Sequence, residues 1–338
     1  MISFLNDYST GCAKEVLDAL TKTNDLYSVG YGEDEYTKNA IDTIRNLVND
    51  NDAFVQFLVG GTQTNLSFLS RMLPYEAVIA SDTGHIAVHE TGAIESTGHK
   101  VITVPNHNSK IIPSEVERVM NEHYSFHMVI PKVLYISQST EYGLVYSLEE
   151  LKALREVCDK YNLYLYIDGA RISQALALGN ISLEDIYNLS DAFYIGGTKN
   201  GLLFGEALVI RNKNLTANFK WTVKQRGALL AKGRLLGLQF DAFFKNDLYI
   251  SLATQANFMA DELRKIFKHH NIEIYNENKT NLIFVFLDDK LVKYLEQYVL
   301  FDEDIIVDGK NTYRFVTSYA TNMKDITMFA DIINEFYK

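Results

Sequence analysis

The sequence is poor in cysteine, proline and tryptophan. It has two cysteines, four prolines and one tryptophan among 338 residues. Because Cys12 and Cys158 alone cannot make a disulfide framework, we expect reduced thiols, as in a cytoplasmic protein. Cys158 falls on the apolar stripe of an expected helix, where packing is a commoner role than reactivity. The few prolines, and the lack of a Gly/Ser-rich linker, argue against a string of separate modules.

Long apolar runs and an excess of positive charge are also missing. No run approaches the roughly 18 apolar residues that a membrane-spanning helix needs. The first seven residues are too short and too acidic a stretch for a signal peptide. The formal net charge of -11 argues against nucleic acid or an anionic membrane as the main partner. We therefore expect a cytoplasmic protein that binds neither nucleic acids nor membranes.

Helical and strand patterns alternate along most of the chain. Short β-rich runs cover residues 53–59, 77–80, 101–104, 133–137, 163–167 and 192–195. Helical patterns precede the first run, at residues 35–49, and lie between later runs, at residues 62–73 and after the capping box Ser147 to Glu150. This alternation predicts an α/β fold with a mostly parallel sheet flanked by helices.

The pattern changes after about residue 245. A helix is expected at residues 252–269, strands at 272–275, 282–287, 305–307 and 313–318, and a last helix at 323–337. Strands that end in a helix predict a smaller α+β domain. We therefore divide the chain into a large domain, residues 1–245 with the N-terminal segment, and a small domain, residues 246–338.

Asp168 and Lys199 each follow a predicted strand. Asp168 opens Asp-Gly-Ala-Arg, and Lys199 stands in Gly-Gly-Thr-Lys-Asn. Ligands of such sheets bind beyond the carboxyl ends of the strands, so the two side chains can converge. A lysine amine can hold the aldehyde of pyridoxal phosphate (PLP) as a Schiff base, and a carboxylate can keep its pyridine nitrogen protonated. Singly, Asp168 could be a helix cap and Lys199 a solvated loop residue.

Gly60, Gly61 and Thr62 join an expected strand to an expected helix. Free N–H groups and the helix dipole at such a junction can bind an anion. A plain glycine turn, with Thr62 as the helix cap, is the alternative.

His85 is a further candidate for the same site. Its imidazole could stack on a pyridine ring and exchange a proton, or it could be a surface or cap histidine. His89 and Glu90 follow within about one turn, a spacing that could suggest zinc. Because no third ligand is evident nearby, we expect no metal.

Arg171 and Arg314 could each bind an anion. Arg171 could pair with Asp168 or with an external anion such as phosphate. Arg314 lies in an expected strand, where a buried guanidinium needs a carboxylate partner. That partner could be internal, or it could be the α-carboxylate of an amino acid.

Together these residues resemble the threonine aldolase and β-eliminating lyase family of PLP enzymes, which have the aspartate-aminotransferase-like fold, fold type I. The resemblance runs over nearly the whole chain, from residues 6–9 and 31–34 to residues 314–317. It implies that Lys199 forms the Schiff base, Asp168 pairs with the pyridinium and His85 stacks on the ring. Gly60, Gly61 and Thr62 would cradle the phosphate.

The resemblance also implies how substrate and subunits are arranged. Arg171 and Arg314, together with Ser9, would hold the substrate carboxylate. Tyr31 and Lys224 would lie beside the site at a subunit interface of a homo-oligomer, either a dimer or a tetramer built as a dimer of dimers.

Two segments depart from the family's pattern. Many members carry an Asn-Thr-His-Asn segment whose histidine contacts the β-hydroxyl, but the corresponding residues 137–143 contain no histidine. A triple-glycine stretch before Met-Arg corresponds here to residues 227–232, with one glycine and no arginine. The first departure leaves the proton acceptor open, with His85 or a water that it positions as the candidate.

The implied activity is PLP-dependent aldol cleavage of L-threonine, L-allo-threonine and related β-hydroxy-α-amino acids to glycine and an aldehyde. One alternative is a β-eliminating lyase for another amino acid, which would release ammonia and a keto acid. Others are a PLP-fold interaction protein without catalysis, and a metal hydrolase that uses His85, His89 and Glu90.

Overall fold

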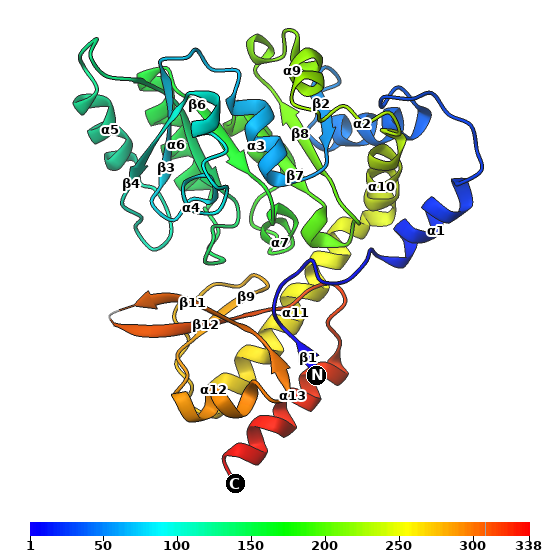
Figure 1. Ribbon diagram of the computed structural model, residues 1–338, viewed down its shortest axis with the longest axis vertical. Helices are drawn as coiled ribbons and strands as arrows, with labels where there is room; N and C mark the ends of the chain where they lie inside the picture. Colours follow the sequence, from blue (N-terminus) through cyan, green and yellow to red (C-terminus); the bar gives the residue numbers. More distant parts are fainter. Residues whose placement is uncertain (308) are drawn as a thin grey trace.

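The computed structural model describes residues 1–307 and 309–338, and its upper part contains a seven-stranded sheet (Figure 1). The strand order is β2-β8-β7-β6-β5-β3-β4. The strands are β2 (Phe54–Leu58), β3 (Glu76–Ser81), β4 (Lys100–Val104), β5 (Ile130–Ser137), β6 (Tyr164–Asp168), β7 (Ala192–Gly196) and β8 (Glu206–Ile210). Neighbours from β4 to β7 pair in parallel, whereas β8 runs antiparallel to both β7 and β2. The predicted α/β fold with a mostly parallel sheet is confirmed.

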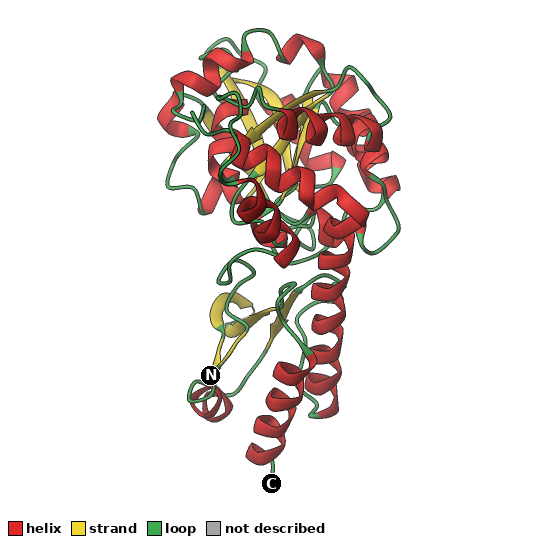
Figure 2. Cartoon of the chain, turned by 90° about the vertical axis from the view of Figure 1, so that its right-hand side faces the viewer, coloured by secondary structure: helices red, strands yellow, loops and turns green. Residues whose placement is uncertain are grey.

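Helices lie on both sides of this sheet (Figure 2). They are α1 (Lys14–Thr23), α2 (Glu35–Leu47), α3 (Gly61–Leu69), α4 (His85–Val88), α5 (Pro113–Glu122), α6 (Leu148–Tyr161), α7 (Ile172–Leu176), α8 (Leu183–Leu189), α9 (Phe219–Gln225) and α10 (Arg234–Phe244). Short 3-10 turns are η1 (Glu95–Thr97), η2 (Thr198–Asn200), η3 (Lys213–Leu215) and η4 (Lys245–Asp247). The central strands read as continuous apolar runs because both of their faces are covered.

The capping box predicted before α6 is present. The Ser147 side chain accepts from the Glu150 backbone, and the Glu150 side chain accepts from the Ser147 backbone. The helix ends at Asn162, whose left-handed φ of 55° turns the chain back toward β6. These two signals set the start of β6 and thereby the place of Asp168 at its carboxyl end.

A smaller part follows α11 (Leu248–His269), the long helix that runs down from the upper sheet (Figure 1). It contains a three-stranded antiparallel sheet in the order β11-β12-β9. Its remaining elements are β9 (Leu282–Val285), α12 (Asp289–Leu295), β10 (Val299–Leu300), β11 (Asp302–Val307), β12 (Lys310–Val316) and α13 (Met323–Phe336). The expected strand at residues 272–275 is wrong, since only an isolated bridge between Ile274 and Val285 forms there.

The smaller part has a hydrophobic core of its own, in which Phe267, Phe315 and Phe329 are fully buried. Ile2 and Phe4 also belong to this core, and β1 (Ile2–Ser3) pairs in parallel with β10. The first residues therefore pack with the C-terminal part. The division of the chain near residue 245 stays a prediction. It assigns residues 2–4 to the large domain, whereas Ile2 and Phe4 pack in the core of the smaller part.

Candidate active site

Several strand ends meet at one edge of the seven-stranded sheet. β6 ends there with Asp168, β7 ends with Gly196 just before Lys199, and β2 ends just before Gly60. β8 runs the opposite way, so it begins at this edge with Glu206, in register with Gly196. The three predicted positions therefore share the edge, and Glu206 joins them.

Asp168 is almost completely buried and accepts four hydrogen bonds. Oδ1 accepts from the Tyr194 hydroxyl and the Ala170 N–H, and Oδ2 accepts from the Tyr135 hydroxyl at 2.6 Å and the Asn65 amide at 3.1 Å. These donors offset the hydration that the carboxylate loses on burial. Burial and the nearby Asp168 charge raise the pKa values of Tyr135 and Tyr194 well above the usual range, so both phenols stay protonated donors.

Glycines allow the backbone to approach Tyr194, one of the donors to this carboxylate, closely. A Cβ on Gly169 would lie 1.7 Å from the Tyr194 carbonyl oxygen, so no side chain fits there. A Cβ on Gly61 would lie 3.0 Å from the Tyr194 hydroxyl. Gly60 is the N-cap residue of α3 and has no side chain to cap the helix, and Thr62 is exposed beside it. The first N–H groups of α3 are thus suited to an anion.

His85 begins α4 and is joined to Asp168 through two intermediate residues. Its Nδ1 lies 2.8 Å from Oε1 of buried Glu90, and its backbone N–H donates to Glu141 at 3.1 Å. The Asn65 amide donates to the same Glu90 oxygen at 2.8 Å and also to Asp168. A chain His85–Glu90–Asn65–Asp168 therefore connects two predicted site residues. The sequence had suggested Glu90 only as a metal ligand, and it had given Asn65 no role.

His89 lies beside His85, with 5.6 Å between the ring centroids. Burial and the neighbouring His85 lower its pKa. Glu90 bonds to His85 and Asn65. Within residues 1–307 and 309–338, no group of three or more His, Cys, Asp or Glu side chains is arranged to hold a metal ion.

Lys199 lies in the turn η2, directly beyond β7. Burial, followed by the positive charge of Arg171, lowers the pKa of its ammonium group. A lowered pKa increases the share of neutral amine, which is the form that attacks a carbonyl carbon.

Glu206 lies under the same turn and accepts a 2.8 Å hydrogen bond from the Thr198 hydroxyl. Burial raises the pKa of Glu206 to about 8, although Thr198 and Lys199 act in the opposite direction. Its second oxygen, Oε2, is buried and makes no hydrogen bond within the described chain. The turn that carries Lys199 thus rests on a buried carboxyl group whose pKa is raised.

Arg171 is held by the N-terminal segment. It donates two hydrogen bonds to Asp7, at 2.7 and 3.2 Å, and Asn281 donates a third to the same carboxylate at 2.9 Å. Burial alone would raise the pKa of Asp7, but the charges of Arg171 and Lys199 outweigh it and lower the pKa. Ser9, two residues beyond Asp7, donates to Asn6. The predicted carboxylate-binding role of Arg171 and Ser9 stays a prediction.

Arg314 lies in β12 and has two acidic partners in the neighbouring strand. Its guanidinium is 3.0 Å from Asp302 and 2.9 Å from Asp304. The internal ion pair considered for this arginine is therefore formed. Burial raises the pKa of Asp304, while Arg314 opposes that shift. If Arg314 binds a substrate carboxylate, its guanidinium must do so while it is also paired with Asp302 and Asp304.

Tyr31 and Lys224 come together although they are far apart in the sequence. The Lys224 ammonium lies 5.6 Å from the centroid of the Tyr31 ring, a cation–π distance. Tyr31 is half exposed. Their predicted place at a subunit interface stays a prediction.

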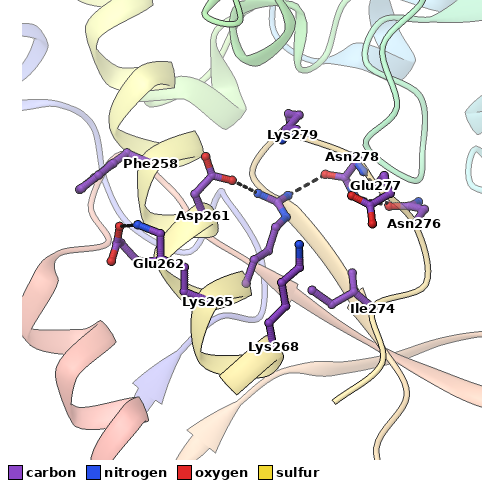
Figure 3. A pocket seen from close by; sticks show the side chains of 11 residues that line it. Phe258, Asp261, Glu262, Lys265, Lys268, Ile274, Asn276, Glu277, Asn278 and Lys279 are labelled. Carbon is purple, nitrogen blue, oxygen red and sulfur yellow. Dashed lines mark hydrogen bonds and ion pairs between the residues drawn. The ribbon is translucent and has the colours of Figure 1, made fainter. Parts of the chain in front are cut away.

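A cavity of about 430 Å³ lies elsewhere, between α11 and residues 274–279 (Figure 3). The buried Arg264 lines it, and donates to Asp261, to Asn278 and to the carbonyls of Thr280 and Leu282. This cation therefore links α11 to residues 278–282. None of the residues that line this cavity belongs to the site at the sheet edge.

A family model for beta-eliminating lyases matches residues 3–290. The chain belongs to the beta-eliminating lyase family. The chain is similar to the low specificity L-threonine aldolase of a Pseudomonas species, with 34% identity over 78% of this chain and 77% of that protein. The low specificity L-threonine aldolase of Pseudomonas aeruginosa is 30% identical over 97% of this chain and 95% of its own.

Solved structures agree with this family membership. The structure of Leishmania major threonine aldolase has a TM-score of 0.98, 39% sequence identity and full coverage of both chains. The chain is therefore a lyase of a PLP-dependent enzyme family with the fold-type I architecture. Among the described residues, no helix combines the length and apolar character that a membrane crossing requires.

Proposed function

We propose that this protein binds PLP at the sheet edge and cleaves L-threonine, L-allo-threonine and related β-hydroxy-α-amino acids to glycine and an aldehyde. The observation that carries the proposal is the meeting of Asp168, with its four hydrogen-bond donors, and Lys199, with its lowered pKa, at one edge. The similarity to threonine aldolases over the whole chain supports the choice of reaction.

The residues at the edge fit PLP. The Lys199 amine suits its aldehyde, the Asp168 carboxylate its pyridine nitrogen, and the uncapped start of α3 at Gly60, Gly61 and Thr62 its phosphate. The start of α3 lies close to the Asp168 cluster, since a Cβ on Gly61 would lie 3.0 Å from the Tyr194 hydroxyl, which donates to Asp168. When bound, PLP withdraws electrons from the substrate bond that breaks.

The protein's own residues would bind and orient the substrate and move its proton. Arg171, Arg314 and Ser9 would hold the α-carboxylate and so set which bond is cleaved. His85, which would stack on the cofactor ring, would accept the β-hydroxyl proton or hold a water that accepts it.

A homo-oligomer, dimer or tetramer, would place Tyr31 and Lys224 next to a neighbouring subunit's site. The exposed apolar side chains of Tyr27, Val29 and Tyr31 support an interface in this segment. The two free thiols, Cys12 and Cys158, support a cytoplasmic location.

A substrate panel tests the proposal. The PLP-loaded protein is incubated with several β-hydroxy-α-amino acids, and aldehyde, glycine, ammonia and keto acid are measured. Aldehyde with glycine is the expected result. Ammonia with a keto acid would favour the β-eliminating alternative, and no product from any substrate would favour a protein without catalysis.

A further inference from the structure

We propose that Glu90 is a positioning residue for His85: by accepting the hydrogen of Nδ1, it leaves Nε2 as the unprotonated ring nitrogen. Asn65 holds Glu90 in place for this role. That Nε2 receives the proton of the substrate's β-hydroxyl group rests on the proposed function.

The two contacts at Glu90 Oε1 determine the tautomer of His85. This oxygen lies 2.8 Å from His85 Nδ1 and 2.8 Å from the Asn65 amide nitrogen. An ionised carboxylate has no hydrogen to donate, so it can only accept from both partners. The hydrogen in the contact with His85 therefore lies on Nδ1. The neutral imidazole then has its lone pair on Nε2, which is the arrangement that a proton acceptor needs.

The burial of Glu90 strengthens this contact. Its side chain is 0% exposed, and Oε2 makes no hydrogen bond with residues 1–307 or 309–338. Asn65 and His85 are thus the two donors that offset the desolvation of this carboxylate. The His85 ring is partly exposed, but its acceptor is not, and a hydrogen bond to a buried carboxylate is stronger than one at the surface, so this contact favours one orientation of the ring.

The orientation of Asn65 is fixed from its other end. The Tyr166 hydroxyl donates to the Asn65 carbonyl oxygen at 3.0 Å, so the amide nitrogen must face the two acids. That nitrogen donates to both Glu90 and Asp168. One amide therefore satisfies two buried carboxylates and ties the position of His85 to that of Asp168.

A second carboxylate near His85 provides a matched control. Glu141 contacts the backbone N–H of His85 at 3.1 Å and the Ser137 hydroxyl at 2.7 Å. Glu141→Gln and Glu90→Gln each replace one carboxyl group close to the same histidine by an amide, but only the second variant alters the partner of the ring.

The tautomer is read directly by solid-state NMR of the PLP-loaded protein labelled with ¹³C,¹⁵N-histidine, with the His85 signals assigned by their loss in His85→Asn. We expect a protonated Nδ1 and an unprotonated Nε2 in the wild type and in Glu141→Gln, and a changed or mixed pattern in Glu90→Gln. A protonated Nε2 with a bare Nδ1 in the wild type would overturn the proposal, and this spectrum needs no variant of Glu90 to fold.

Kinetics give the second readout. Glu90→Gln should lower kcat by about 10- to 100-fold with little change in KM, as loss of an orienting partner does. In a His85→Asn background the same change should cost less than about threefold, since Glu90 acts through His85. Equal losses in both backgrounds would overturn the positioning role. If the spectrum agrees but no aldehyde is released, the proposed reaction fails while the tautomer assignment stands.

Discussion

The Tyr135 hydroxyl donates a 2.6 Å hydrogen bond to Oδ2 of Asp168, and both residues are buried. Oδ2 has one other donor, the Asn65 amide. A buried carboxylate oxygen that loses a donor keeps the cost of its desolvation. The Tyr135 hydroxyl should therefore affect both the free energy of unfolding and the ability of Asp168 to bind the pyridine nitrogen of PLP.

Tyr135→Phe should lower the free energy of unfolding by about 1–3 kcal/mol and weaken PLP binding. Urea denaturation and PLP titration of the apoprotein measure the two effects. Tyr187→Phe is the matched control, because its hydroxyl also donates at 2.6 Å to a carboxylate, that of the partly exposed Asp50. Unchanged PLP affinity in Tyr135→Phe would show that this donor does not matter to the cofactor.

The free energy of unfolding of Glu206→Gln should increase relative to that of the wild type as pH rises. The pKa of Glu206 is raised to about 8 in the folded chain, above its ordinary value of 4.5. The stability that it contributes is therefore present below about pH 4.5 and is lost as pH rises through about 8. Each unit of pKa difference corresponds to about 1.4 kcal/mol. Gln cannot ionise, so the variant escapes this loss.

Melting temperatures of the wild type and Glu206→Gln between pH 5 and 9 test this. The variant should gain on the wild type across the range, whereas Glu122→Gln, on the exposed end of α5, should track the wild type. A constant difference between Glu206→Gln and the wild type at all pH values would contradict the raised pKa.

Arg314→Lys should raise KM for the amino acid by about tenfold or more, with a smaller change in kcat, because lysine cannot make the planar two-pronged contact with a carboxylate. Steady-state kinetics with L-threonine measure both constants. Arg118→Lys is the control, since Arg118 also pairs with two acids, Glu115 and Glu122, on the exposed surface of α5. An unaltered KM in Arg314→Lys would show that Arg314 does not bind the substrate carboxylate and that it serves only in the ion pairs with Asp302 and Asp304.

The sequence revealed those parts of the site that lie at the carboxyl ends of parallel strands. Asp168, Lys199 and Gly60 each follow an apolar run, and the geometry of a parallel sheet brings such positions to one edge. Glu206 could not be found in this way, because it begins an antiparallel strand and reaches the same edge from the other direction. Asn65 and Glu90 were missed as partners because their contact joins residues 25 positions apart.

The fold was predictable where one face of an element is exposed and the pattern is periodic, as in α2. α10 was missed because all of its residues from 236 to 244 are buried, so no polar face marks a helical period. The predicted helix 62–73 is α3, Gly61–Leu69, so its start was almost right and its end four residues too long. Helix ends without a glycine or proline signal are hard to locate from sequence.

The cleavage itself is measured by incubating the PLP-loaded protein with L-threonine and quantifying acetaldehyde and glycine, in parallel with Lys199→Ala. We expect equal amounts of the two products from the wild type. The variant should give no product, and it should lose the visible absorbance of covalently bound PLP. Threonine consumed without acetaldehyde, or a variant that keeps that absorbance and activity, would show that this protein is not a threonine aldolase that acts through Lys199.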